Sequence, residues 1–263
     1  MQTTINRIIP QKGNAKTMIQ RLRAYIDPVD DTWCTKIQPA NEMQIEELRQ
    51  QLNLVERGLE LPEAYVEFLH HAGECAGGLF STFCAEMSIS SLISDNEGIC
   101  INNADDTKPY CFTFLKDYLG ICYTMNLDNQ NQKIFMEEDY AVSENFENLV
   151  FQSAITQYEE KYYPFYVYFS SSIHGLNTSE IGIKEIDLFD YADQIVKKYC
   201  LNKLWFSDSY CFFACSNEMS LMLNRSGGGV YGAICFNEKE MQREMEKVLL
   251  SKINTKILNI LVR

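Results

Sequence analysis

The chain has 263 residues, of which 46% are hydrophobic and 22% charged, so it can bury a full core as one large domain or two small ones. Its net charge of −13 argues against binding to nucleic acid or to anionic membranes. The first residues do not form the apolar core of a signal peptide, and no apolar run is long enough to cross a bilayer, so we expect a cytoplasmic protein.

Three amphipathic helices are expected early in the chain. The first covers residues 15–25, and a loop follows that partly buries Trp33. Asn41 and Gln44 match a capping box, which starts the second helix. The third begins at Pro62, because a proline in the first turn loses no intrahelical hydrogen bond. Its inward face carries Tyr65, Phe68 and Leu69.

Strand patterns follow these helices. Alternating apolar and polar residues over 87–93 predict a strand, and residues 95–108 are expected to form an exposed loop. Further strands are predicted over 111–115, 120–127 and 133–136, with a turn at 128–131 between the last two. Ser143 is then expected to cap a helix. The inward side chains of that helix are Phe146, Leu149 and Val150.

The second half of the chain shows a similar alternation of elements. The expected strands are 162–169, 204–206, 210–215, 219–223 and 230–236, with a helix over 188–199. A capping-box pattern at 237–240 opens a last amphipathic helix, and residues 257–262 are either a strand or the end of a helix. Strands followed by an amphipathic helix therefore occur in both halves, which leaves open a degenerate duplication.

Acidity is concentrated in residues 1–155, which hold 11 Lys and Arg against 23 Asp and Glu, whereas residues 156–263 hold 12 against 13. No Lys or Arg occurs between Arg57 and Lys108, a stretch that we call the base-free interval. Such a field attracts basic partners, although carboxylates that only keep a protein soluble give the same composition. The carboxylates expected to bind a partner are Glu74, Glu86, Asp95, Glu97, Asp105, Asp106, Asp128, Glu137, Glu138 and Asp139.

No motif indicates catalysis, a metal or a cofactor. His70 and His71 point about 100° apart on a helix, so they do not complete a four-ligand zinc site with Cys75. The glycines at 227, 229 and 232 match a dinucleotide-binding loop by letters alone, since a strand-like run follows where that loop needs a helix. His174 lacks the signature of a hydrolase. We expect no enzyme activity, no metal and no cofactor, and ten reduced cysteines.

Two motifs resemble the SUKH superfamily. The first is Leu61-Pro62-x-x-Tyr65-x-x-Phe68-Leu69 followed by Gly73. The second is Phe114-x-x-Asp117-x-x-Gly120-x-x-Tyr123, followed by Leu127-Asp128, Ile134-Phe135 and a helix. The chain departs from the family at Ala72-Gly73, where Asn-Gly is common. The similarity covers residues 41–155.

The resemblance implies an α+β module, and with the helix and strand patterns outside it we expect an α+β fold in three parts. These are an N-terminal helix and loop over 1–40, a SUKH-like module over 41–155 with a mostly antiparallel or mixed sheet flanked by helices, and an α+β segment over 156–263 packed on the module. The last part is either an extension or a degenerate second copy.

Most bacterial SUKH proteins are thought to be immunity proteins. The resemblance therefore implies that this chain binds and neutralises a cognate polymorphic toxin, a basic nuclease-type enzyme, by occluding its active site. The alternative is an intracellular scaffold or regulator without a toxin partner. The sequence does not indicate the oligomeric state.

Overall fold

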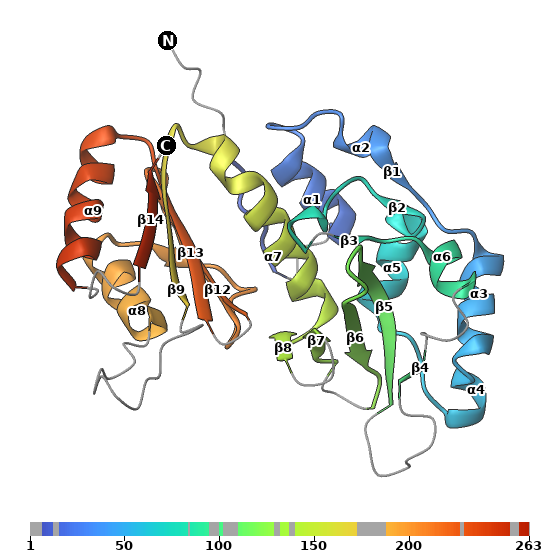
Figure 1. Ribbon diagram of the computed structural model, residues 1–263. Coiled ribbons are helices and arrows are strands. Elements are labelled where there is room, and N and C mark those ends of the chain that lie inside the picture. Colours follow the sequence, from blue (N-terminus) through green and yellow to red (C-terminus); the bar gives the residue numbers. More distant parts are fainter. Residues whose placement is uncertain are drawn as a thin grey trace, which may run out of the picture. The chain divides into compact units, whose positions relative to one another are not determined.

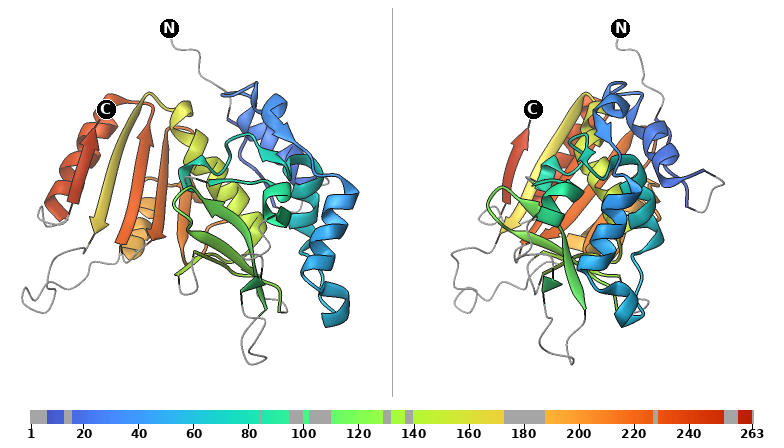
Figure 2. Two further views of the ribbon diagram at one scale, coloured as in Figure 1. Left: turned by 45° about the vertical axis from the view of Figure 1, so that its right-hand side comes forward. Right: turned by 90° about the vertical axis from the view of Figure 1, so that its right-hand side faces the viewer.

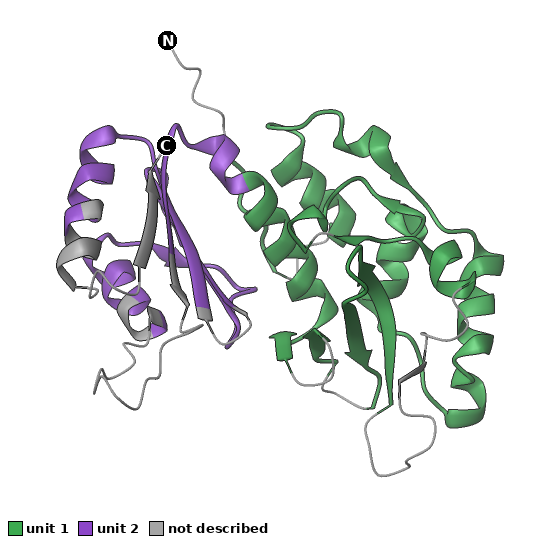
Figure 3. Cartoon of the chain, in the orientation of Figure 1, with its two compact units in different colours: residues 1–158 green, residues 159–263 purple. Residues whose placement is uncertain are grey.

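The computed structural model describes residues 7–12, 16–83, 85–94, 100–101, 110–128, 132–136, 140–172, 188–226, 229–252 and 258–262 (Figure 1). The chain divides into two compact units, unit 1 (Met1–Tyr158) and unit 2 (Glu159–Arg263) (Figure 3). Both units combine helices with an antiparallel sheet, which confirms the predicted α+β class. Unit 1 ends at residue 158, whereas the predicted boundary follows residue 155.

Unit 1 has seven α-helices among its described residues, and side chains cap the N-termini of some of them. The seven helices are α1 (Met18–Ile26), α2 (Trp33–Lys36), α3 (Glu42–Gln51), α4 (Leu54–Arg57), α5 (Glu63–Ala72), α6 (Ile89–Ser94) and α7 (Phe146–Tyr158). The predicted capping box of α3 is confirmed: Gln44 N donates to Asn41 Oδ1 over 3.0 Å, and Asn41 N donates to Gln44 Oε1 over 2.8 Å. Pro62 is the N-cap residue of α5. Trp33 is fully buried and donates its indole N–H to Ala76 O.

The main sheet of unit 1 is antiparallel throughout its described strands. These are β3 (Ala85–Glu86), β4 (Cys100–Ile101), β5 (Cys111–Asp117), β6 (Cys122–Asn126), β7 (Ile134–Met136) and β8 (Tyr140–Ser143), in the order β3-β5-β6-β7-β8 with β4 also on β5. A separate small sheet joins β1 (Ile37–Gln38) to β2 (Cys75–Ala76), and η1 (Ser81–Phe83) precedes β3. The three strands predicted between residues 111 and 136 are confirmed.

Helices α5 and α7 pack against the sheet through aromatic rings. The ring centroid of Tyr65 lies 5.6 Å from that of Phe112, 6.1 Å from that of Phe114 and 5.0 Å from that of Phe146, all in edge-on arrangements. Phe112 and Phe114 both reach this cluster because alternate residues of a strand point to the same face of the sheet. The predicted inward face of α5 is confirmed, since its three side chains have no exposed surface.

Two local predictions in unit 1 are wrong. Residues 87–93 do not form a strand, because Ser88 Oγ accepts the backbone N–H of Ser91 and opens α6 instead. The helix α7 is capped by Asn145, whose Oδ1 accepts from Asn148 N at 2.8 Å, and not by Ser143, which is the last residue of β8. The buried face predicted for α7 is confirmed.

Unit 2 is one antiparallel sheet with helices on one face (Figures 1 and 2). Its elements are η2 (Glu159–Tyr162), β9 (Phe165–Ser172), α8 (Leu188–Lys198), β10 (Asn202–Lys203), β11 (Cys211–Cys215), β12 (Met219–Ser226), β13 (Gly229–Phe236), α9 (Lys239–Lys252) and β14 (Leu258–Val262). The strand order is β10-β11-β12-β13-β9-β14. Ile195 of α8 and Met245 of α9 share a buried core with Leu221 and Ile234 of the sheet.

Most elements predicted in the second half are confirmed, with one correction. The predicted strand over 204–206 is wrong, because the short strand in this region is β10, two residues earlier. The closing segment, left open as strand or helix, contains strand β14.

The two units share a run of elements in the same order. Four strands followed by a helix occur as β5-β6-β7-β8-α7 in unit 1 and again as β10-β11-β12-β13-α9 in unit 2. An aspartate serves the turn before the second strand of each run: Asp117 Oδ1 accepts two backbone N–H groups, and so does Asp208 Oδ1. The duplication stays a prediction, because the helices that precede the two runs differ.

Candidate functional site

Three of the ten predicted partner-binding carboxylates lie in the described part of the chain, namely Glu74, Glu86 and Asp128. The other seven lie outside the described residues: Asp95, Glu97, Asp105, Asp106, Glu137, Glu138 and Asp139. The three described carboxylates are not gathered at one place, and each serves a different part of unit 1.

Glu74 holds together the segments around α6. Its Oε1 accepts hydrogen bonds from Gln44 Nε2 and Ser90 Oγ, and its Oε2 accepts from Ser88 Oγ at 3.1 Å. The backbone N–H of Glu74 donates to Gln38 O over 2.9 Å. The carboxylate is thus engaged inside unit 1, where it links α3 to the start of α6.

Asp128 stabilises the end of the β5–β6 pair through hydrogen bonds. Its Oδ2 accepts the backbone N–H of Tyr110 at 2.5 Å, and its own N–H donates to Asn126 Oδ1 over 2.7 Å. Leu127 N donates to Tyr110 O next to it, over 2.8 Å. These local bonds give Asp128 a structural task in the sheet.

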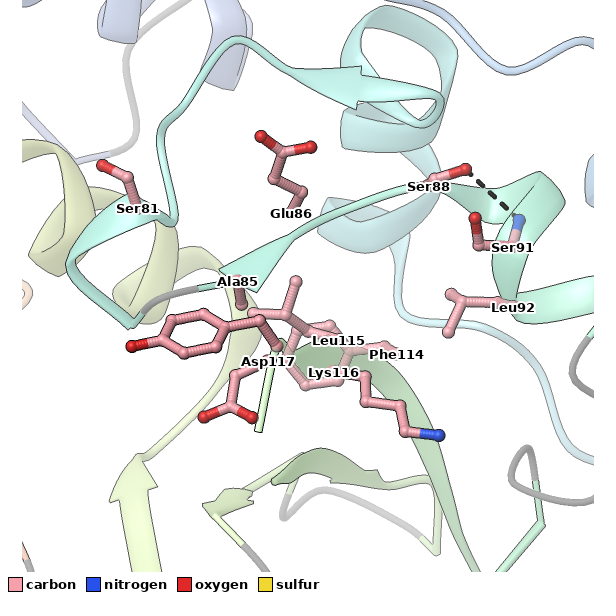
Figure 4. Close-up of a pocket in the computed structure, with 11 residues that line it drawn as sticks. Ser81, Ala85, Glu86, Ser88, Ser91, Leu92, Phe114, Leu115, Lys116 and Asp117 are labelled. Atoms are coloured by element: carbon pink, nitrogen blue, oxygen red, sulfur yellow. Dashed lines mark hydrogen bonds between the residues drawn. The ribbon is translucent and has the colours of Figure 1, made fainter. Parts of the chain in front are cut away.

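The third carboxylate, Glu86, is exposed and lines a hollow of about 560 Å³ on unit 1 (Figure 4). The hollow exists because the chain leaves the sheet edge after β3, forms α6 and returns at β4. Strands β3 and β4 therefore pair with opposite ends of β5, and α6 also contacts β5. The walls come from η1, β3, α6 and residues 114–118.

The β5–β6 turn forms one rim of the hollow, and Asp117 and Gly120 set its shape. Gly120 N donates to Asp117 O over 3.1 Å, and Asp117 Oδ1 accepts from the N–H groups of Leu119 and Ile121, both at 2.8 Å. Gly120 has φ of 88°, which favours glycine. Tyr118 and Leu119 occupy the two central positions and are 75% and 71% exposed.

The apolar pair at this turn was not predicted as functional. A turn of this kind needs the aspartate and the glycine, but it accepts almost any residue between them. Nothing in the fold therefore requires Tyr118 and Leu119 to be large and apolar. The signal that could have found them is an apolar pair between a turn-forming Asp and Gly, since such side chains have no core to enter.

The rejected metal and nucleotide sites can be placed in the structure. His70 Nδ1 lies 3.6 Å from Glu42 Oε1, and the described residues include no group of three His, Cys, Asp or Glu that could hold a metal ion. Gly229 and Gly232 lie within strand β13. A Cβ atom on Gly232 would lie 2.5 Å from Phe169 Cζ, so close packing accounts for that glycine.

Comparisons of the chain with protein-family models, with curated proteins and with solved structures gave no match. Among the residues that the structure describes, no helix is long and apolar enough to cross a membrane.

Proposed function

We propose that this protein is a cytoplasmic immunity protein that binds a cognate polymorphic toxin, a basic nuclease-type enzyme, and occludes its active site. The observation that carries the proposal is the acidity of unit 1, which holds 11 Lys and Arg against 23 Asp and Glu, while unit 2 holds 12 against 13. Complementary charge raises association rates by about 10- to 1,000-fold. The resemblance of residues 41–155 to the SUKH motifs supports the same class of partner.

Neutralisation in this proposal is steric. Carboxylates of unit 1 stand where the phosphates of a nucleic acid substrate would otherwise lie, so the toxin loses access to its substrate. Within the base-free interval Glu60, Glu63 and Glu86 are exposed, whereas Glu67 Oε1 accepts the backbone N–H of Ile19 at the start of α1. The exposed carboxylates are available to a partner without loss of internal hydrogen bonds.

The test uses the toxin domain encoded in the reading frame immediately upstream. Cells that express this domain should grow only when the full chain is produced with it. Purified chain should bind the domain, and the association rate should fall steeply as salt is added. The double variant Asp105→Lys with Asp106→Lys should slow association at low salt by about tenfold. The matched control is Glu238→Lys with Glu240→Lys, which reverses two exposed charges in the nearly neutral unit 2.

Two results would contradict the proposal in different ways. Absence of both rescue and binding would show that the chain is not an immunity protein for that toxin, and would favour the scaffold alternative. Tight binding with an unchanged association rate and salt dependence in the Asp105 and Asp106 variant would retain the immunity function and remove its electrostatic basis.

A further inference from the structure

The β5–β6 turn carries two large apolar side chains that are neighbours in the sequence and are both exposed to solvent. Tyr118 and Leu119, which we call the tip, are 75% and 71% exposed. The other exposed large apolar residues in the described part of unit 1 are isolated along the chain, namely Ile8, Met43, Val55 and Tyr140. Isolated apolar residues are normal on a protein surface, whereas an adjacent pair on a turn offers a partner more than one side chain to bind.

The tip is held in place because one aspartate closes the turn from both ends. Asp117 N donates to Ile121 O over 2.9 Å, and Gly120 N donates to Asp117 O over 3.1 Å. With the two N–H groups that Asp117 Oδ1 accepts, this residue makes four hydrogen bonds across a three-residue loop. Gly120 adopts the left-handed backbone that such a loop requires. The loop is therefore formed before a partner binds, and it loses little conformational entropy on binding.

Unit 2 contains a turn of the same design without an apolar tip. Asp208 N donates to Cys211 O over 2.8 Å, and Asp208 Oδ1 accepts two backbone N–H groups. The residue after this aspartate is Ser209, which is exposed, where unit 1 has Tyr118. The turn thus tolerates a small polar residue at this position, so the fold does not account for the tyrosine.

The charges around the tip indicate the kind of partner. The register of β3 with β5 places Glu86 opposite Lys116 on one face of the sheet, so these two charges balance each other beside the turn. Unit 1 as a whole holds 23 Asp and Glu against 11 Lys and Arg. Like charge opposes docking of this unit on a second copy of itself or on an anionic membrane, and it favours a basic protein.

We propose that the tip enters the active-site cleft of the toxin, where Tyr118 and Leu119 pack on the apolar surface that otherwise holds a base of the substrate. The inference rests on the proposed function and names the contact that occludes the cleft. Active sites are concave, so occlusion needs a projecting element such as a hairpin turn. Proteins that bind single-stranded nucleic acid stack its bases on aromatic side chains, and a tyrosine ring fits the same kind of surface.

The tip and the carboxylates have separate tasks in this proposal. The acidic surface of unit 1 speeds the encounter with a basic toxin, because long-range attraction acts on the association rate. The tip has no charge and acts only once the two proteins touch, so it sets the dissociation rate. Tyrosine is among the residues that most often dominate the binding energy of an interface.

The first experiment separates these tasks by kinetics. Association and dissociation of the full chain and the upstream toxin domain are measured at several salt concentrations. The double variant Tyr118→Ser with Leu119→Ser should raise the dissociation rate by about 100-fold. Its association rate, and the salt dependence of that rate, should not change because no charge is altered. The matched control Met43→Ser with Val55→Ser removes side chains that are 78% and 86% exposed on the same unit, and it should leave both rates unaltered.

The second experiment locates the tip in the complex and does not depend on the stability of the double variant. The photoreactive residue p-benzoylphenylalanine replaces Tyr118 in one preparation and the exposed Val55 in another. Ultraviolet light should join position 118 to a peptide of the toxin's active-site cleft, and position 55 should give no such product. An uncleavable single-stranded oligonucleotide in excess should suppress the product at position 118, because both compete for one surface.

The outcomes distinguish this inference from the proposed function. If the wild-type chain neither binds the toxin domain nor rescues cells from it, the proposed function fails, and the inference fails with it. If the wild type binds and the tip variant dissociates at the wild-type rate, the immunity function stands and the inference is overturned. The inference is also overturned if position 118 joins a toxin peptide outside the cleft, or if it joins two copies of the chain, since the tip would then bind a second copy.

Discussion

The hydroxyl of Tyr65 gives a quantitative test of the aromatic core. Tyr65 has no exposed surface, and its hydroxyl has no hydrogen-bond partner among the described residues. A buried hydroxyl without a partner destabilises the folded state by about 1–3 kcal/mol. Removing it leaves a void the size of one atom, which itself costs about 1 kcal/mol. Tyr65→Phe keeps the ring contacts and should therefore raise the free energy of unfolding by about 1 kcal/mol.

Tyr110→Phe is the matched control with the opposite sign. The Tyr110 hydroxyl is also buried, but it donates to Leu52 O over 2.5 Å. Removing it leaves a buried carbonyl without its donor and should cost about 1–2 kcal/mol. Unfolding by urea is followed through Trp33 in a Trp205→Phe background, since Trp33 then is the one tryptophan left and reports on unit 1.

The pH dependence sharpens the same test. Burial raises the pKa of Tyr65 far above its ordinary value, so the folded protein keeps this hydroxyl protonated where the unfolded chain loses the proton, near pH 10. The unfolded state then binds fewer protons, and stability falls as the pH rises above that value. The Tyr65→Phe variant lacks this loss, so its advantage should widen above about pH 10. A Tyr65→Phe variant less stable than the wild type by about 1 kcal/mol would refute the reasoning, because it would reveal a partner for the hydroxyl, such as a buried water.

Three further predictions concern single contacts. Glu74→Ala should lower the free energy of unfolding of unit 1, measured in urea, by about 2 kcal/mol, because its partners lose a charged acceptor. The control Glu56→Ala, at an exposed position, should change that free energy by no more than about 0.5 kcal/mol. Gly120→Ala should lower the free energy of unfolding by about 1–2 kcal/mol in the same assay. The left-handed backbone alone causes this loss, since a Cβ atom there meets nothing within 4 Å. An unchanged stability would show that the turn adopts another conformation. The hydrogen bond from Lys198 lowers the pKa of Glu244, so the stability that this pair contributes is present at neutral pH and is lost as the pH falls through the lowered value. NMR titration of the Glu244 carboxyl should therefore give a higher midpoint in Lys198→Met than in the wild type, and equal midpoints would contradict the assignment.

Elements with local signals could be predicted from the sequence. The capping box of Asn41 and Gln44 acts over three residues, and Asp117 and Gly120 close a turn within four, so each can be recognised without its surroundings. Residues 87–93 show the limit of such signals. Ile89 and Leu92 are buried at helical spacing, but a six-residue helix also contains enough alternation to resemble a strand. The deciding contact is the cap from Ser88, and serine is common in both settings.

The candidate site depends on contacts that no local signal contains. Glu86 lies at the edge of the sheet because β3 pairs with the end of β5, and the space beside it exists because α6 interrupts that edge. Charge counting could identify unit 1 as the acidic unit, but it could not separate Glu74, which is bonded internally, from Glu86, which faces solvent. The distinction comes from Ser88 and Ser90, whose hydroxyls are directed at Glu74 by the fold of α6.

The position of β9 has a consequence for synthesis. This strand pairs with β13 on one side and with β14 on the other, and the ribosome makes both later. The chain must grow from Ser172 to Gly229 before the first partner exists, which at about 5–20 residues per second takes roughly 3–11 seconds. During that time the aromatic strand has no sheet to join, while the described strands of the unit 1 sheet have already been made. Nascent chains halted inside unit 2 should therefore be the ones that engage chaperones, and the acidic unit should be folded first.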